Sequence, residues 1–261
     1  MFSDRDRRRM EELAKLAESV RPAIEAAQEA ARAAMPPPEW FERASKLVAV
    51  FHEAFRASLP ANWEGFSVSD VRAAVDLMLD HGLNVAWVPR NVVVRALVGA
   101  SDFETREAIL VEHEAAVVDD LEACLGEIQL ASLSEVVEAM SEAVAAYRAG
   151  FFRAAQALAA TTLGSLLLEV HGDPKFRPAK ERFEAMDIDG LTVVRAREAA
   201  VLRCVARAIE FTWVGLPGFN RHATAHGSTA DQFTRPNALS ALLLVVGVAR
   251  EAAFWEERGE S

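Results

Sequence analysis

Apolar residues recur along this chain at intervals of three and four positions, which is the spacing of one face of an α-helix. One such stretch runs from Glu39 to Ser58, and its apolar face consists of Trp40, Ala44, Leu47, Val48, Phe51 and Phe55. Ala, Leu, Glu and Arg, which favour helices, are abundant, and the alternating pattern of a half-buried strand is scarce. The pattern predicts an all-α protein.

Proline and glycine mark where the predicted helices stop. An opening helix ends before the triplet Pro36-Pro37-Pro38, because proline lacks an amide hydrogen and clashes with the preceding turn. From residue 134 onward the expected helices cover 134–148, 151–170, 192–213 and 234–257. We therefore predict an N-terminal helix (1–35), a helical domain of unknown role (39–131) and a helical bundle (132–258).

The 39–131 part carries three more specific expectations. Residues 102–130 are predicted to form one long acidic helix, and Ser69 or Asp70 is expected to cap the helix that precedes residue 82. The glycine and proline content of residues 82–89 predicts a loop, in which we expect Trp87 to be exposed.

Composition limits the class of protein. The chain has 261 residues, of which 51% are hydrophobic, so it can bury a sizeable core. Its first residues are highly charged and lack the apolar run of a secretory signal, and its longest apolar run, Leu239–Ala249, is too short to cross a bilayer. We expect a cytoplasmic protein that makes no membrane contact. Cys124 and Cys204 lie in helical patterns, which predicts burial and gives no disulfide framework or cysteine zinc site.

Charge is distributed unevenly along the chain. Residues 102–142 hold twelve acidic residues and one basic residue, Arg106. The net charge of this segment, −11, is therefore the same as the net charge of the whole chain. An acidic flank of this kind is solvated or faces a basic protein partner. Residues 201–235 hold four arginines against two acidic residues, which makes that region mildly basic.

The densest candidate chemistry lies within this basic region, at residues 220–226. Asn220, Arg221, His222 and His226 follow one another there between two apolar helical segments. Arginine presents a forked cation that suits phosphate oxygens, and histidine accepts or donates a proton near neutral pH. The residues are suited to phosphodiester cleavage.

Two other interpretations of these residues remain open. His222 and His226 are four positions apart and would share one face of a helix, where they could bind a transition metal with His171 or Asp231 as third ligand. The zincin pattern, in which a Glu follows the first His, is absent here. Alternatively, Arg221 pairs with a carboxylate such as Glu169 or Asp231, and the histidines have structural roles.

The spacing of Arg221, four intervening residues and His226, with His222 directly after the arginine, resembles the signature of HEPN domains. The likeness covers residues from about 134 to the end and implies a HEPN-like helical bundle preceded by an additional helical domain. Arg106 and His113 have a comparable spacing on the acidic segment, and we interpret this second match as coincidental.

The resemblance implies a metal-independent endoribonuclease or RNA-binding effector that needs no cofactor. His226 would take a proton from an RNA 2′-hydroxyl, Arg221 would stabilise the phosphate, and His222 would act as an acid or hold the substrate. Asn220 and Arg235 would bind the substrate. The resemblance also implies that the chain forms a homodimer and acts in phage defence or in a toxin system.

A protein of a different class also fits the sequence. In this alternative the chain is a noncatalytic helical protein-interaction module, which binds a partner through the acidic 102–142 segment or the N-terminal helix.

Overall fold

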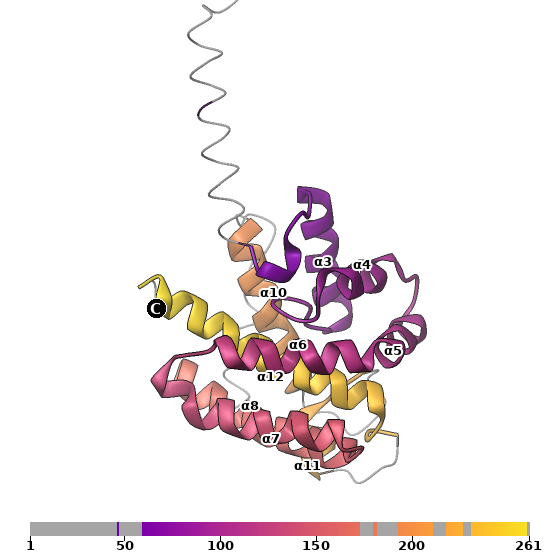
Figure 1. Cartoon of the computed structure of the whole chain (residues 1–261), viewed down its shortest axis with the longest axis vertical. Helices are drawn as coiled ribbons and strands as arrows, with labels where there is room; N and C mark the ends of the chain where they lie inside the picture. Colours follow the sequence, from indigo (N-terminus) through magenta and orange to yellow (C-terminus); the bar gives the residue numbers. More distant parts are fainter. Residues whose placement is uncertain are drawn as a thin grey trace, which may run out of the picture. The chain divides into compact units, whose positions relative to one another are not determined.

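The computed structural model describes residues 46, 59–172, 180–181, 193–210, 218–226 and 231–259. In these ranges every regular element is a helix, which confirms the all-α prediction (Figure 1). The elements are η1 (Ala61–Trp63), α3 (Val68–His81), α4 (Asn91–Gly99), α5 (Phe103–Glu112), α6 (Glu114–Glu127), η2 (Ala131–Leu133), α7 (Ser134–Arg148), α8 (Phe152–His171), α10 (Val193–Ala208), α11 (Arg221–His226) and α12 (Arg235–Glu257). The predicted helices before residue 58 and the segment 211–217 lie outside the described residues.

Side-chain caps determine where several helices begin. Ser67 caps α3, because its hydroxyl accepts the backbone N–H of Asp70 while the Asp70 carboxylate accepts the N–H of Ser67. The sequence expectation of a cap at Ser69 or Asp70 was therefore wrong by two or three positions. Thr234 caps α12 through the N–H of Asn237, with proline in the first turn.

The predicted long acidic helix is two helices. Helix α5 ends at Glu112 and α6 begins at Glu114, with His113 between them. No glycine or proline marks this break in the sequence. Apolar side chains are buried on both sides of the break: Leu110 at the end of α5, and Val117, Val118 and Leu121 in α6.

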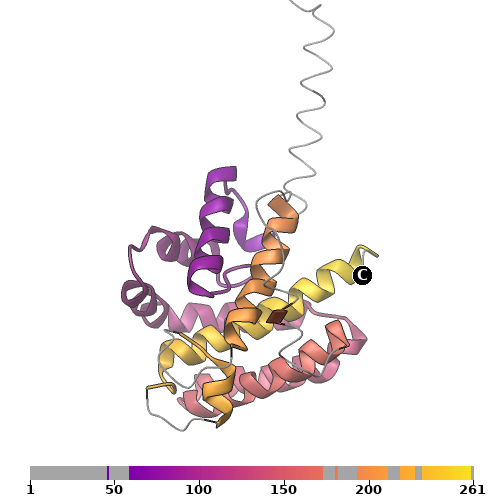
Figure 2. The same ribbon diagram turned by 180° about the vertical axis from the view of Figure 1, so that it is seen from behind.

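Helix α12 is the core around which five of the described helices pack. It contacts α5, α6, α7, α8 and α10, and Figures 1 and 2 show it running between the α7–α8 pair and the helices of the N-terminal side. By length and composition α12 could span a membrane, but 78% of its most apolar window is buried inside the protein. The burial confirms that residues 239–249 form a buried helix.

Residues 58–261 form a single unit in which early and late helices share interfaces. Helix α10 packs against α3, and α12 packs against α5 and α6. The boundary expected near residue 131 lies inside this unit. The cysteines, Cys124 and Cys204, are both buried and free, as predicted.

The loop before α4 is fixed to α12 and α10 by a buried polar cluster. The carboxylate of Glu251 accepts hydrogen bonds from Trp87 Nε1 at 2.7 Å and Trp255 Nε1 at 2.8 Å, and it forms an ion pair with fully buried Arg197 at 2.7 Å. Trp87 is half-buried, so its expected exposure was wrong. Arg197 also faces the rings of Trp87 and Phe254, at 5.4 and 4.9 Å from their centroids.

Candidate functional site

The candidate site begins with the way Asn220 starts the short helix α11. Its side-chain oxygen accepts the backbone N–H of Ala223 at 2.8 Å, and its amide nitrogen donates to the carbonyl of Glu210 at 3.0 Å. Only 2% of the residue is exposed. Asn220, predicted to bind substrate, is thus engaged by the backbone and fixes the position of α11.

Helix α11 is held against α8 by a glutamine that sequence reasoning missed. Gln156 is fully buried, and its amide nitrogen donates to Thr224 Oγ1 at 2.9 Å and to the carbonyl of Gln232 at 3.0 Å. The Thr224 hydroxyl in turn donates to the carbonyl of Asn220 at 2.8 Å. A lone glutamine on the buried face of an alanine-rich helix was the available signal, because buried polar side chains need partners.

The rings of the two histidines of α11 lie close together and are tilted relative to each other. The ring centroids of His222 and His226 are 4.8 Å apart, with 47° between the ring planes. His222 is half-buried and His226 is exposed. Burial lowers the pKa of His222, and the charges of His226 and Arg221 lower it further. The neutral form of the His222 imidazole is therefore favoured over its protonated form.

Arg221 is the first residue of α11 and is half-buried, and this burial lowers its pKa from a very high ordinary value. The guanidinium remains charged at neutral pH. Helical geometry places Arg221 roughly 140° around the axis from His226, whereas His222 and His226 differ by roughly 40°. The close pair on this helix is thus His222 with His226, while Arg221 flanks the pair.

A metal site at this pair would need a third ligand. Among the described side chains, no group of three or more His, Cys, Asp or Glu residues could hold a metal ion. Asp231 is exposed and belongs to no such group, and the side chain of His171 lies outside the described residues.

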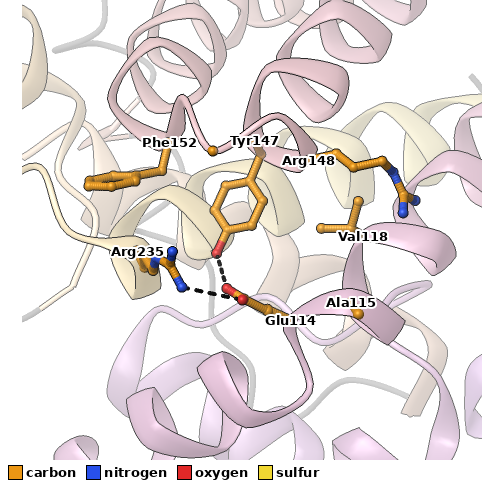
Figure 3. Close-up of a pocket in the computed structure, with 8 residues that line it drawn as sticks. Glu114, Ala115, Val118, Tyr147, Arg148, Phe152 and Arg235 are labelled. Atoms are coloured by element: carbon orange, nitrogen blue, oxygen red, sulfur yellow. Dashed lines mark hydrogen bonds and ion pairs between the residues drawn. The ribbon is translucent and has the colours of Figure 1, made fainter.

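A cavity of about 190 Å³ lies where α6, α7, α8 and α12 meet (Figure 3). Its lining residues are Glu114, Ala115, Val118, Tyr147, Arg148, Gly150, Phe152 and Arg235. Tyr147 reaches from α7 to Glu114, to which its hydroxyl donates at 3.0 Å, and Arg235 approaches the other carboxylate oxygen at 3.3 Å. The structure therefore places Arg235, a predicted substrate-binding residue, at this cavity.

The cavity and α11 differ in their chemistry, but helix α8 contributes residues to both. Phe152 lies at the cavity and Gln156, one turn later in α8, holds α11. Burial, followed by the hydrogen bond to Glu114, raises the pKa of Tyr147, so the phenol stays a donor. The cavity was not predicted from the sequence. Glu114 is one of many carboxylates in the acidic 102–142 segment, and its partners Tyr147 and Arg235 lie far from it along the chain.

The second Arg–His spacing has no comparable arrangement. Arg106 donates to the carbonyls of Leu97 at 3.1 Å and Ala100 at 2.6 Å, and to His81 Nε2 at 2.8 Å. It therefore joins α3, α4 and α5, while His113 lies at the break before α6. Its structural role agrees with our interpretation of this match as coincidental.

Comparison of the chain with protein-family models, curated proteins and solved structures finds no match. The described residues define an all-α protein with a histidine pair on a short helix and a separate arginine-lined cavity.

Proposed function

We propose that the chain is a metal-independent endoribonuclease or RNA-binding effector that acts through α11. The observation that carries the proposal is the His222–His226 pair, with ring centroids 4.8 Å apart and Arg221 at the start of the same helix. RNA transphosphorylation needs a base, an acid and a cation for the phosphate, and these three side chains are of the required types. The resemblance of residues 134–261 to HEPN domains supports the same chemistry.

The proposed reaction transfers protons without a redox step. The base takes the proton of a ribose 2′-hydroxyl, whose oxygen attacks the adjacent phosphorus. The bond from phosphorus to the 5′-oxygen breaks, and this oxygen receives a proton from the acid. The products are a 2′,3′-cyclic phosphate and a 5′-hydroxyl.

The lowered pKa of His222 supports its use as the base. His226, whose ring lies beside it, would then act as the acid. The resemblance alone gives the base role to His226. Arg221 would bind the phosphate oxygens, and a second copy of the chain would complete the site in a homodimer.

The test is incubation of the purified chain with mixed cellular RNA in EDTA, with the product ends analysed for cyclic phosphate. Wild type should cleave, and His222→Ala, His226→Ala and Arg221→Ala should each lose at least about a hundredfold in rate. His113→Ala changes a histidine outside α11 and should cleave normally. Equal cleavage by wild type and all three α11 variants would contradict the proposal.

A noncatalytic interaction module is the alternative, and the side chain of Phe151 favours it. Phe151 precedes α8 and is 67% exposed, so its ring is available to a partner. Absence of cleavage by wild type, together with stable capture of a protein partner that Phe151→Ser abolishes, would support this alternative.

A further inference from the structure

The cavity at Glu114 is held by residues in fixed places at helix ends. Glu114, Phe152 and Arg235 are the first residues of α6, α8 and α12, and Tyr147 lies in the last turn of α7. A volume of about 190 Å³ is smaller than the roughly 300–1,000 Å³ of sites for drug-sized ligands. The cavity therefore suits a ligand group of a single ring system.

The carboxylate of Glu114 is the polar centre of this cavity and accepts two hydrogen bonds from different sides. Tyr147 donates to one oxygen at 3.0 Å and Arg235 to the other at 3.3 Å. A carboxylate can accept further N–H donors, because each oxygen has two lone pairs. Glu114 thus selects a ligand that presents N–H groups and disfavours one that presents only acceptors.

The ion pair between Arg235 and Glu114 can open at little cost. The two side chains are 55% and 34% exposed and their atoms are 3.3 Å apart, which is the geometry of a weak surface pair. Arg148, on the other side of Tyr147, is bound to Asp119 and Glu122 at 2.7 and 2.9 Å. Arg235 is therefore the cation that an incoming anion can draw away from Glu114.

Aromatic rings provide the apolar part of the cavity. Phe152 lies on the same side of Tyr147 as Arg235 (Figure 3), and Val118 adds an aliphatic surface on the other side. Every nucleobase can stack on an aromatic ring, so Phe152 would add affinity without discriminating between bases. Selection between ligands would come from Glu114.

We propose that this cavity binds the guanine base of a guanosine phosphate. Guanine is the common base that presents two adjacent N–H donors, at N1 and the 2-amino group, which match the two oxygens of one carboxylate. These donors would take the place of the Arg235 guanidinium at Glu114, the ring would lie against Phe152, and Arg235 would turn to the phosphate.

The guanosine phosphate has two sources, a free nucleotide or a residue of single-stranded RNA. The RNA source rests on the proposed function, whereas binding of a free nucleotide is independent of RNA cleavage. Measuring binding separately from cleavage therefore distinguishes failure of this inference from failure of the proposed function.

The test is titration calorimetry of the full chain with guanosine, inosine and adenosine monophosphates and with short single-stranded RNAs with and without guanosine. We expect guanosine monophosphate or guanosine-containing RNA to bind. The matching inosine compound, which lacks the 2-amino group, should bind at least about fivefold more weakly, and the adenosine compound about tenfold or more weakly. Binding of the free nucleotide assigns the site to nucleotides, and binding of guanosine-containing RNA alone assigns it to RNA.

Two variants and a control localise the binding. Glu114→Gln should weaken guanosine binding about tenfold or more, because the charged acceptor is lost. Thermal unfolding shows whether Glu114→Gln lowers the stability of the protein. If it does, Phe152→Leu still tests the site, because it should weaken guanosine binding and leaves the Glu114–Tyr147 hydrogen bond in place. Glu138→Gln, an exposed carboxylate on α7 outside the cavity, should bind normally. Equal affinity for adenosine and guanosine, unchanged binding in both variants, or no guanosine binding in any form would overturn the inference.

Discussion

The side-chain amide of Gln156 on α8 donates a hydrogen bond to the hydroxyl of Thr224 on α11, across 68 residues of sequence. The same amide nitrogen reaches the carbonyl of Gln232, just before α12. One buried side chain therefore connects α11, the helix that carries the histidine pair, to the residue Gln232 before α12.

Replacing Gln156 with Leu should loosen this connection. The change removes both hydrogen bonds and leaves the Gln232 carbonyl without this donor, which should lower the free energy of unfolding by about 1–3 kcal/mol. Urea unfolding measures the change. Gln129→Leu is the matched control, since Gln129 is exposed and bonds within one turn, and its effect should stay within about 0.5 kcal/mol. Equal stability of the two variants would show that Gln156 does not hold α11.

Gly247 in α12 should not tolerate a methyl group. A Cβ at this position would collide with the side-chain amide of Asn84 and lie 3.1 Å from the carbonyl of Ala86. Asn84 is fully buried and donates to the carbonyl of Leu243 at 3.3 Å, so it has little room to move. Gly247→Ala should therefore destabilise the protein by about 1–3 kcal/mol in thermal or urea unfolding.

Gly126 provides the control for this substitution. It lies in α6, and a Cβ there meets no atom within 4 Å. Gly126→Ala should therefore stabilise the protein by about 0.4–1 kcal/mol, through a smaller loss of chain entropy and better helix propensity. If Gly247→Ala stabilised the protein as Gly126→Ala should, the close approach of the 82–89 loop to α12 would be refuted.

Glu251 should be among the most sensitive carboxylates of the described helices. Glu251→Ala leaves the fully buried Arg197 guanidinium without this counter-charge and removes the acceptor for two tryptophan N–H groups, which should cost about 3–5 kcal/mol. Glu257→Ala removes the exposed partner of Arg250 and should cost less than about 1 kcal/mol. Chemical unfolding measures the free energy of unfolding of both variants. A small difference between the two values would contradict the role assigned to Glu251.

Stability should fall on acidification because of His81. Burial, and then the charge of Arg106, lower its pKa, and Arg207 acts in the same direction, against Asp80. Its Nε2 accepts a hydrogen bond from Arg106, which requires a neutral ring. The folded state therefore binds this proton less readily than the unfolded state. The associated stability is present above the unfolded pKa of about 6.5 and is lost as the pH falls below it.

The measurement is the midpoint of thermal unfolding at pH 7.5 and 5.5. Wild type should lose more stability between these values than His81→Gln, whose side chain does not titrate. His113→Gln is the histidine control and should keep the wild-type dependence. A wild-type dependence in His81→Gln would contradict the assignment to His81.

The sequence predicted helix bounds best where a helix-breaking residue follows the helix. The expected helix 134–148 ends at the same residues as α7, because Gly150 follows it and the apolar period is clear. The break at His113 and the anchoring of Trp87 were missed, because both depend on partners far along the chain, such as Glu251 for Trp87. Helix–helix packing decided these features over local propensity.

The candidate site shows the same limit. The sequence located His222 and His226 on one helical face, since a spacing of four residues fixes that relation. It did not locate the cavity. There Glu114 bonds Tyr147, which is 33 positions away in the sequence, and Arg235, which is 121 positions away. Their proximity follows from the way α6, α7 and α12 pack.

The central position of α12 has a consequence for how the chain acquires its fold during synthesis. Helices α5 to α8 emerge from the ribosome before the helix that covers their apolar faces, since α12 is the last helix described. Until residues 235–257 have been translated, those faces have no native partner in α12 and are exposed to aggregation or to chaperones. The core can therefore be completed only after α12 has emerged, later than the helices that it covers.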